Sequence, residues 1–289
     1  MKKAYVLYNP LSGDRCGKEK AEKVCEYFSG EECVVQDITA LKDFDAFAEK
    51  LASEDEIVVC GGDGTLNRFI NDTLHLKLRN PLFYYATGSG NDFLRDIGAK
   101  IEDGPVRINC YVENLPTVTV NGKTYRFING VGYGIDGYCC EVGDELRCKG
   151  KKPNYTTIAI TGLLFHYKAT NAKVTVDGKT YTYNKVWIAP TMNGRYYGGG
   201  MMPVPDQDRN DPNKGVAVMV MHNAGRIGTL CVFPSIFTGK HIERRKKVSV
   251  HRGHDITVEF DRPVTLQIDG ETILNVTKYH ACSAVPVKK

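Results

Sequence analysis

Three short polar, glycine-rich segments carry the residues that could perform chemistry. The first is Gly61-Gly62-Asp63-Gly64-Thr65, which follows the apolar run 57–60 and precedes a helical pattern. Backbone amides at such a strand–turn–helix junction bind phosphate, because a helix N-terminus leaves its first N–H groups unpaired and carries partial positive charge. Asp63 inside an anion-binding loop needs a cation or a donor beside it, which indicates Mg²⁺ or a role in proton transfer. A plain tight turn is the alternative.

Two further loops follow strand-like segments at equivalent points. Gly88-Ser89-Gly90-Asn91-Asp92 follows residues 82–86, and Asn9-Pro10-Leu11-Ser12-Gly13 follows residues 4–8. Open α/β sheets bind ligands at the carboxyl ends of their strands, so three such loops together predict a nucleotide-binding cleft. The 61–65 loop is not a Walker A motif, because no Gly-Lys-Ser/Thr follows it.

Regular strand and helix patterns must position these loops. Strands are expected at 4–8, 33–38, 56–60 and 82–86, and apolar residues recur at helical spacing within 21–28, 44–51 and 66–74. This alternation predicts an α/β N-terminal nucleotide-binding domain, residues 1–110, with a parallel sheet between two helical layers.

After about residue 105 the pattern becomes mostly antiparallel β. Asn121-Gly122 and Asp177-Gly178 each separate two strand-like runs and predict hairpins with type I′ turns. Further strands are expected at 215–221, 246–250, 256–260 and 264–268, and helices near 156–167 and 227–237. We expect a β-sandwich or open barrel over residues 111–289, whose C-terminal tail could return to the first domain.

Composition excludes several classes of protein. The 289 residues are 42% hydrophobic and 25% charged, which is typical of a folded globular chain. The longest apolar stretch, 158–165, is too short to span a bilayer, and no signal peptide is evident, so we expect a cytoplasmic protein without a transmembrane segment. A net charge of +4 is too small to indicate nucleic-acid binding. The ten cysteines lack CxxC spacing and are expected to be reduced, with Cys25 and Cys60 as small buried residues.

The sequence resembles the diacylglycerol kinase catalytic family of lipid kinases and, more distantly, sphingosine kinases and NAD kinases. The matching segments are Asn9-Pro-x-Ser-Gly13, Gly61-Gly-Asp-Gly-Thr-Leu-Asn67, Gly88-Ser-Gly-Asn-Asp-Phe93 and Asp269-Gly-Glu271. The Asn-Asp-Phe segment favours the lipid branch, whereas the GGDGT loop is shared with NAD kinases and 6-phosphofructokinases. The resemblance implies a nucleotide-binding domain followed by a β-rich domain, with the active site between them.

The resemblance also implies roles for individual residues. It implies Glu271 as the general base for the acceptor hydroxyl, with Asp63 as the rival base; a plain hairpin turn at Asp269-Gly270 is the alternative explanation of the second motif. The residues implied to hold ATP are Asn9, Ser12, Gly13, Thr39, Gly61, Gly62, Asp63, Gly64, Thr65, Asn67, Ser89, Asn91 and Asp92.

The chain departs from the family at two places. The family usually has a short Asp-Gly loop that binds Mg²⁺, whereas here the loop is longer and Lys214 precedes Gly215. Asp208 or Asp211 could supply the Mg²⁺ ligand after a shift of the loop, and a solvated acidic loop is the alternative. The segment 115–118 lacks the Asp that the family tends to place before its first β-domain hairpin.

These features together predict an ATP- and Mg²⁺-dependent lipid kinase that phosphorylates a hydroxyl of diacylglycerol or a related lipid at the inner membrane surface. Apolar residues in 158–165 and 230–237 could hold lipid or form ordinary core, and basic clusters at 147–152 and 244–247 could contact anionic lipid or simply be solvated. A homodimer is compatible with the β-rich domain. The alternatives are a small-molecule kinase of NAD-kinase type, whose Asn-Glu pair is missing here, and a nucleotide-binding regulator without turnover.

Overall fold

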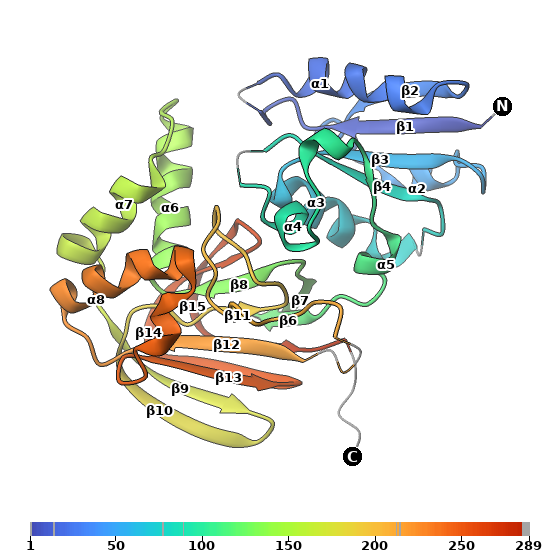
Figure 1. Ribbon diagram of the computed structural model, residues 1–289. Coiled ribbons are helices and arrows are strands. Elements are labelled where there is room, and N and C mark those ends of the chain that lie inside the picture. The colour runs from blue at the N-terminus through green and yellow to red at the C-terminus, as the bar shows by residue number, and fades with distance from the viewer. Residues whose placement is uncertain are drawn as a thin grey trace. The chain divides into compact units, whose positions relative to one another are not determined.

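The chain folds into two compact units, Met1–Asn114 and Leu115–Lys289 (Figure 1). The computed structural model describes residues 2–13, 15–76, 78–88, 90–211, 213 and 215–284. The predicted boundary after residue 110 falls inside helix α5 (Asn109–Val112), and the C-terminal tail 285–289 lies outside the described residues. Within the described ranges, no helix combines the length and the apolar character that a membrane span requires.

The first unit is built on a five-stranded sheet with the order β2-β1-β3-β4-β5. Its strands are β1 (Lys3–Tyr8), β2 (Glu32–Asp37), β3 (Glu56–Gly61), β4 (Leu82–Ala86) and β5 (Val106–Arg107). The first four run parallel, as predicted, and the two-residue β5 adds an antiparallel edge that the sequence pattern did not reveal. All residues of β3 after Glu56 are buried, as expected for a central strand covered on both faces.

Helices cover both faces of this sheet (Figure 1). They are α1 (Gly17–Val24), α2 (Phe44–Ala48), α3 (Asp63–Asp72), α4 (Asp92–Asp96) and α5. On one face Ala21 and Val24 of α1 share a core cluster with Val6 of β1. On the other face the ring of Phe47 in α2 meets that of Tyr5 at a centroid distance of 5.5 Å. Tyr5 and Val6 point to opposite faces because consecutive strand residues alternate, so the predicted three-layer α/β domain is confirmed.

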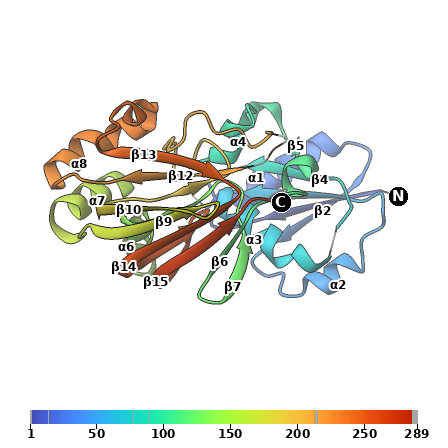
Figure 2. The same ribbon diagram turned by 90° about the horizontal axis from the view of Figure 1, so that it is seen from below.

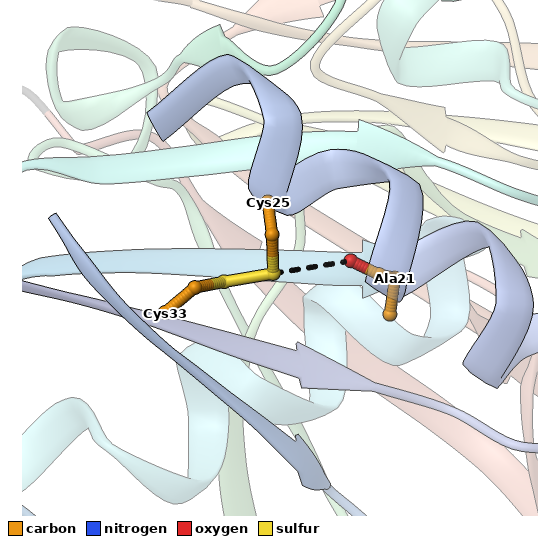
Figure 3. Close-up of a disulfide and its surroundings, with 3 residues drawn as sticks. All are labelled: Ala21, Cys25 and Cys33. Atoms are coloured by element: carbon orange, nitrogen blue, oxygen red, sulfur yellow. Dashed lines mark hydrogen bonds between the residues drawn. A yellow bond between two sulfur atoms is a disulfide. The ribbon is translucent and has the colours of Figure 1, made fainter. Parts of the chain in front are cut away.

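A disulfide joins Cys25 to Cys33 (Figure 3). The expectation that Cys25 is a reduced core residue is therefore wrong. Cys25 begins a 3₁₀ turn at the end of α1, and the chain turns back so that Cys33 on β2 lies with its Cα atom 5.9 Å away, a span that a disulfide bridges. Sequence spacing alone does not reveal this approach. Cys139 and Cys140, although adjacent, are both free.

The second unit contains a ten-stranded sheet whose strand pairs are all antiparallel, as predicted (Figure 2). The long strand β14 pairs with β9 through residues 256–260 and with β8 through residues 266–268, so it belongs to both parts of the sheet. The strands are β6 (Thr117–Val120), β7 (Lys123–Arg126), β8 (Gly130–Tyr133), β9 (Thr170–Val176), β10 (Lys179–Val186), β11 (Thr191–Met192), β12 (Val216–Met221), β13 (Val248–Gly253), β14 (Asp255–Ile268) and β15 (Glu271–Cys282).

Both predicted hairpins of the second unit are present. Asn121 and Gly122 have φ values of 49° and 77° between β6 and β7, and Asp177 and Gly178 have φ values of 46° and 81° between β9 and β10. Two consecutive residues with positive φ are the mark of a type I′ turn.

The helices of the second unit are only partly those predicted. Both predicted helices exist, as α7 (Tyr155–Thr161) with a π-helical turn (Gly162–His166), and as α8 (Arg226–Val232) with a 3₁₀ turn (Phe233–Thr238). The 14-residue helix α6 (Ile135–Cys148) was not predicted, because glycines and cysteines interrupt its apolar pattern. Strand β15 was also missed, since its buried residues do not alternate regularly.

Candidate nucleotide-binding site

Four loops of the first unit meet at one edge of its sheet. The carboxyl ends of β2, β1, β3 and β4 lead to Thr39, Asn9, Gly62 and Thr87, respectively. The parallel register aligns these ends, since Tyr8 lies opposite both Asp37 and Cys60, and Gly61 lies opposite Ala86. Three of the four loops are those selected from the sequence.

Side-chain hydrogen bonds connect the 9–13 loop to its two neighbours. The amide Nδ2 of Asn9 donates to Thr65 Oγ1 at 3.0 Å, and Ser12 Oγ lies 2.9 Å from Thr87 Oγ1. Ser12 Oγ also lies within hydrogen-bond distance of the Asn9 carbonyl oxygen, at 2.8 Å. The predicted residues Asn9, Ser12 and Thr65 therefore form one connected polar surface across three strand ends.

The GGDGT segment runs from the last residue of β3, Gly61, into the first turn of helix α3, which begins at Asp63. Gly62 is the N-cap, and the first N–H bonded to the cap carbonyl is that of Leu66, at 3.1 Å. The amides of Asp63, Gly64 and Thr65 consequently have no acceptor inside the helix. A ten-residue helix presents these donors together with the positive end of its dipole, which suits phosphate oxygens.

Asp63 joins the second and third loops. Its Oδ2 accepts the backbone N–H of Asp92 at 2.8 Å, and its Oδ1 accepts that of Phe93 at 3.2 Å. Through these two hydrogen bonds Asp63 holds the start of α4 against the start of α3.

The same two loops also touch through their backbones. A Cβ atom at Gly88 would lie 2.7 Å from Gly62 Cα, a distance that real Cβ contacts do not reach. Glycine is therefore required here by close approach. Asn91, at the N-cap of α4 with φ of 50°, has a buried Oδ1 with no hydrogen-bond partner among the described residues.

The remaining predicted ATP residues are placed differently. Thr39 lies at the same sheet edge, where its backbone N–H and hydroxyl both donate to Asp37 Oδ1. Asn67 is buried within α3 and accepts a hydrogen bond from Asn71 Nδ2 at 3.1 Å. Gly13 has φ of 57° in the first loop. Ser89 lies outside the described residues.

Lys20 is a candidate that sequence reasoning missed. A Cβ atom at Gly13 would lie 2.5 Å from Lys20 Nζ and 2.8 Å from the Thr87 carbonyl oxygen, so the ammonium group rests against the first loop. Lys20 forms no ion pair within the part of the chain that the structure describes. Lys20 lies one turn into α1, the helix that follows the Asn-Pro-x-Ser-Gly segment. A lysine at this place in the sequence could have been recognised as a phosphate-binding candidate.

In the second unit, Glu271 follows a tight turn. Asp269 and Gly270 have φ values of 47° and 97°, and Glu271 pairs with Ile268 across the β14–β15 hairpin. The Glu271 residue is exposed. Asp269 fixes the turn, because its carboxylate accepts backbone N–H groups of the segment 128–130, including that of Asn129 at 2.9 Å. The motif is therefore a hairpin turn that also holds its acidic residue at a fixed place.

A buried carboxylate that the sequence did not indicate supports the same turn. Asp136, in the first turn of α6, is 7% exposed, and its Oδ2 accepts a hydrogen bond from the Tyr197 hydroxyl at 3.0 Å. Burial raises the pKa of Asp136 to about 6, although hydrogen bonds from Tyr197 and Gln267 partly oppose this. Gln267 Oε1 in turn accepts the N–H of Gly270 at 2.7 Å, next to Glu271. The Gln267 side chain thus connects Asp136 to the turn at Asp269 and Gly270.

The loop predicted to bind Mg²⁺ has a donor set that does not fit a resident Mg²⁺ ion. Asp208 Oδ1 and Asp211 Oδ1 accept backbone N–H groups of their own loop, at 2.8 and 2.7 Å. Between them Arg209 is 5% exposed, and its guanidinium donates to the Ile128 carbonyl at 3.2 Å and to Asn129 Oδ1 at 2.9 Å. The buried charge of this loop is therefore positive, and neither aspartate belongs to a cluster of three potential ligands among the described residues.

Comparison with protein families agrees with this architecture. Residues 3–117 match the diacylglycerol kinase catalytic domain, and residues 129–287 match the YegS C-terminal NAD kinase beta sandwich-like domain. The chain belongs to the family that carries the YegS C-terminal NAD kinase beta sandwich-like domain, and its first unit is similar to the diacylglycerol kinase catalytic domain. The two matches follow each other along the chain in the same order as its two units.

Individual relatives resemble the chain over nearly its full length. A diacylglycerol kinase of Bacillus subtilis is 26% identical over 280 residues, which cover 94% of this chain and 90% of the relative. A diacylglycerol kinase of Mycobacterium tuberculosis H37Rv is 25% identical over 270 residues, which cover 89% of this chain and 85% of the relative. The crystal structure of a diacylglycerol kinase from Bacillus anthracis superposes with a TM-score of 0.62 at 17% identity, covering 98% of this chain and 94% of that one. This structural likeness concerns the fold.

Proposed function

We propose that the protein is an ATP-dependent lipid kinase that transfers the γ-phosphoryl group of ATP to a hydroxyl of diacylglycerol or a related lipid. The observation that carries the proposal is the connected polar surface at the sheet edge of the first unit. There, hydrogen bonds link three loops. Asn9 bonds to Thr65, Ser12 bonds to Thr87, and Asp63 accepts the backbone N–H of Asp92. The similarity of residues 3–117 to the diacylglycerol kinase catalytic domain supports the lipid acceptor.

In this proposal ATP arrives as its Mg²⁺ complex and binds with its phosphates at the start of α3. The amides of the first helical turn supply donors, and the ammonium of Lys20 supplies positive charge beside the 9–13 loop. Phosphoryl transfer is accelerated mainly by positioning and by charge stabilisation, which amides, lysine and metal provide. Asp63 contributes by holding the loops in place.

Glu271 is proposed to accept the proton of the acceptor hydroxyl as the new P–O bond forms. The supporting observation is the rigid turn that precedes it, which Asp269 holds through three backbone N–H groups and Gln267 through a fourth. A base must be held within hydrogen-bond reach of the proton that it removes, and a fixed turn serves that requirement.

A lipid acceptor requires contact with a membrane, and the second unit offers an apolar surface for it. Phe165 is 70% exposed and Ile227 is 75% exposed, on the π-helical turn after α7 and on α8. The two segments are adjacent, since Arg226 donates to the Leu163 carbonyl at 2.7 Å. By contrast Leu163, predicted as either lipid site or core, is fully buried core. We propose that Phe165 and Ile227 insert into the headgroup region of an anionic bilayer.

The catalytic proposal is tested with purified protein, γ-labelled ATP and Mg²⁺. The acceptors are offered separately: diacylglycerol in mixed micelles, a sphingoid base in mixed micelles, and NAD in solution. Transfer of label to a lipid, lost in Glu271→Gln and retained in the matched control Glu259→Gln on the same hairpin, supports the proposal. Label on NAD instead supports the small-molecule kinase. ATP binding without any labelled acceptor supports the regulator.

The membrane proposal is tested by sedimentation with vesicles of phosphatidylglycerol or of phosphatidylcholine. Phe165→Asp and Ile227→Asp should each reduce binding to the anionic vesicles, whereas Leu274→Asp, an exposed position on β15, should not. Equal binding of all variants would refute this surface.

A further inference from the structure

A second cluster of chemically reactive side chains lies at the open end of the β14–β15 hairpin. Asp255 is the first residue of β14, and Cys282, the last residue of β15, lies directly opposite it in the antiparallel register. His280 precedes Cys282 by two residues, so both side chains point to the same face of the sheet. The strand pairing alone therefore brings a carboxylate, an imidazole and a thiol together.

The three ligand atoms converge on a common point. His280 Nε2 lies 2.9 Å from Asp255 Oδ2 and 3.4 Å from Cys282 Sγ, and all three ligand atoms lie within 4.8 Å of one another. Tetrahedral zinc with ordinary bond lengths would separate N from O by about 3.3 Å and N from S by about 3.6 Å. The observed separations differ from these values by a few tenths of an ångström, which rotation of the side chains can supply.

The surroundings of the cluster suit a cation. In the register of β15 with β6, Thr117 lies opposite Cys282 and Thr119 lies opposite His280, so uncharged hydroxyl-bearing residues flank the cluster on that side. The alternate residue Ala281 is fully buried in the core beneath. All three cluster residues are partly exposed, so an ion can enter from solvent and water can complete its coordination.

We propose that Asp255, His280 and Cys282 form a binding site for Zn²⁺ or a similar thiolate-preferring transition metal ion, with solvent in the fourth position. Carboxylate, imidazole and thiolate are the three side-chain ligands that zinc uses in proteins. The site is separate from Glu271, which begins β15, because the 12 residues of this strand extend on the order of 30 Å. An ion bound here would crosslink the end of β15 to the start of β14.

The test is metal binding by the full-length protein, measured first with Co²⁺ and then with Zn²⁺. Co²⁺ should give visible d–d bands and a thiolate-to-metal charge-transfer band at one equivalent. Cys282→Ser should abolish the charge-transfer band, and the matched control Cys148→Ser, an exposed free cysteine, should retain it. Zn²⁺ affinity by equilibrium dialysis should fall at least about a hundredfold in Cys282→Ser and His280→Gln, because loss of a direct ligand exceeds the 10- to 100-fold effect of outer-shell partners.

A stability readout distinguishes metal binding from a merely hydrogen-bonded cluster. Zn²⁺ should raise the unfolding temperature of the unmodified protein and of Cys148→Ser, but not that of Cys282→Ser. Circular dichroism would establish that each variant is folded. Absence of a charge-transfer band, or a band and a zinc affinity unchanged by Cys282→Ser, would overturn the proposal.

Discussion

Replacement of Asp136 by Asn should change how stability depends on pH. The folded protein keeps the proton of Asp136 up to about pH 6, whereas the unfolded chain releases it near 3.8. Because the pKa is raised in the folded state, the contribution of this group to stability is fully present below pH 3.8 and is lost as the pH rises through 6. Above pH 6 the folded state contains a buried, ionised carboxylate.

The expected size of the effect follows from the shift of about two pKa units. At 1.36 kcal/mol per unit the full contribution is about 3 kcal/mol, and about 2.4 kcal/mol of it should be lost between pH 4 and pH 7.5, because the unfolded chain is already partly ionised at pH 4. Asparagine does not titrate, and its carbonyl oxygen can still accept the Tyr197 hydroxyl hydrogen bond. Asp136→Asn should therefore be more stable than wild type at pH 7.5, by up to about this amount, and should lose that advantage toward pH 4.

The assay is thermal and denaturant unfolding of both proteins across this pH range, with Asp206→Asn as the control. Asp206 is an exposed carboxylate, so its variant should follow wild type at every pH. An equal stability difference between Asp136→Asn and wild type at pH 4 and pH 7.5 would refute a raised pKa of Asp136 in the folded protein. A constant difference would mean that Asp136 is ionised throughout, or that its role is limited to packing.

Three further substitutions test the two units. Lys20→Gln should raise KM for ATP at least severalfold with little effect on folding, whereas Lys18→Gln, an exposed lysine on the same helix, should not; equal KM values would remove Lys20 from the site. Gly88→Ala should destabilise the first unit by about 1–3 kcal/mol and weaken ATP binding, because its Cβ would meet Gly62. Gly225→Ala, which meets nothing within 4 Å, should be nearly neutral, and similar melting curves for the two would contradict the close approach. Arg209→Met should cost about 1–3 kcal/mol in denaturant unfolding, because Asn129 Oδ1 loses its guanidinium donor while the Ile128 carbonyl keeps its bond from Asn193 Nδ2; unchanged stability would show that the guanidinium is dispensable.

Much of the first unit could be predicted because local pattern and topology agree there. The continuous apolar run before Gly61 and the helical spacing after Thr65 fix a strand, a turn and a helix, and the handedness of parallel β–α–β connections leaves little choice of arrangement. The strand ends then come together without further information. The structural role of Asp63 could not be predicted from the sequence. Its hydrogen bonds to the backbone of Asp92 and Phe93 depend on how closely two loops approach.

The second unit was harder to predict because its important contacts are non-local. Asp136 follows Gly134 at a strand-to-helix junction similar to that of Asp63, but its burial depends on Tyr197 and Gln267, which are 61 and 131 positions away. The burial of the Arg209 side chain likewise depends on hydrogen bonds to the remote residues Ile128 and Asn129. The sequence identifies the polar loop around Asp208 and Asp211. It does not reveal that the Arg209 guanidinium between them is buried against carbonyl oxygens.

The proposed activity is transfer of phosphate from ATP to a lipid hydroxyl, with Glu271 as the base. The most direct measurement is the initial rate at which label from γ-labelled ATP enters phosphatidic acid in diacylglycerol mixed micelles, compared for wild type and Glu271→Gln at equal ATP occupancy. We predict that wild type forms labelled phosphatidic acid and that Glu271→Gln loses at least about 100-fold in rate while still binding ATP. Unaltered turnover in Glu271→Gln would contradict the assignment of the base, and absence of labelled lipid with wild type would contradict the proposed lipid kinase activity.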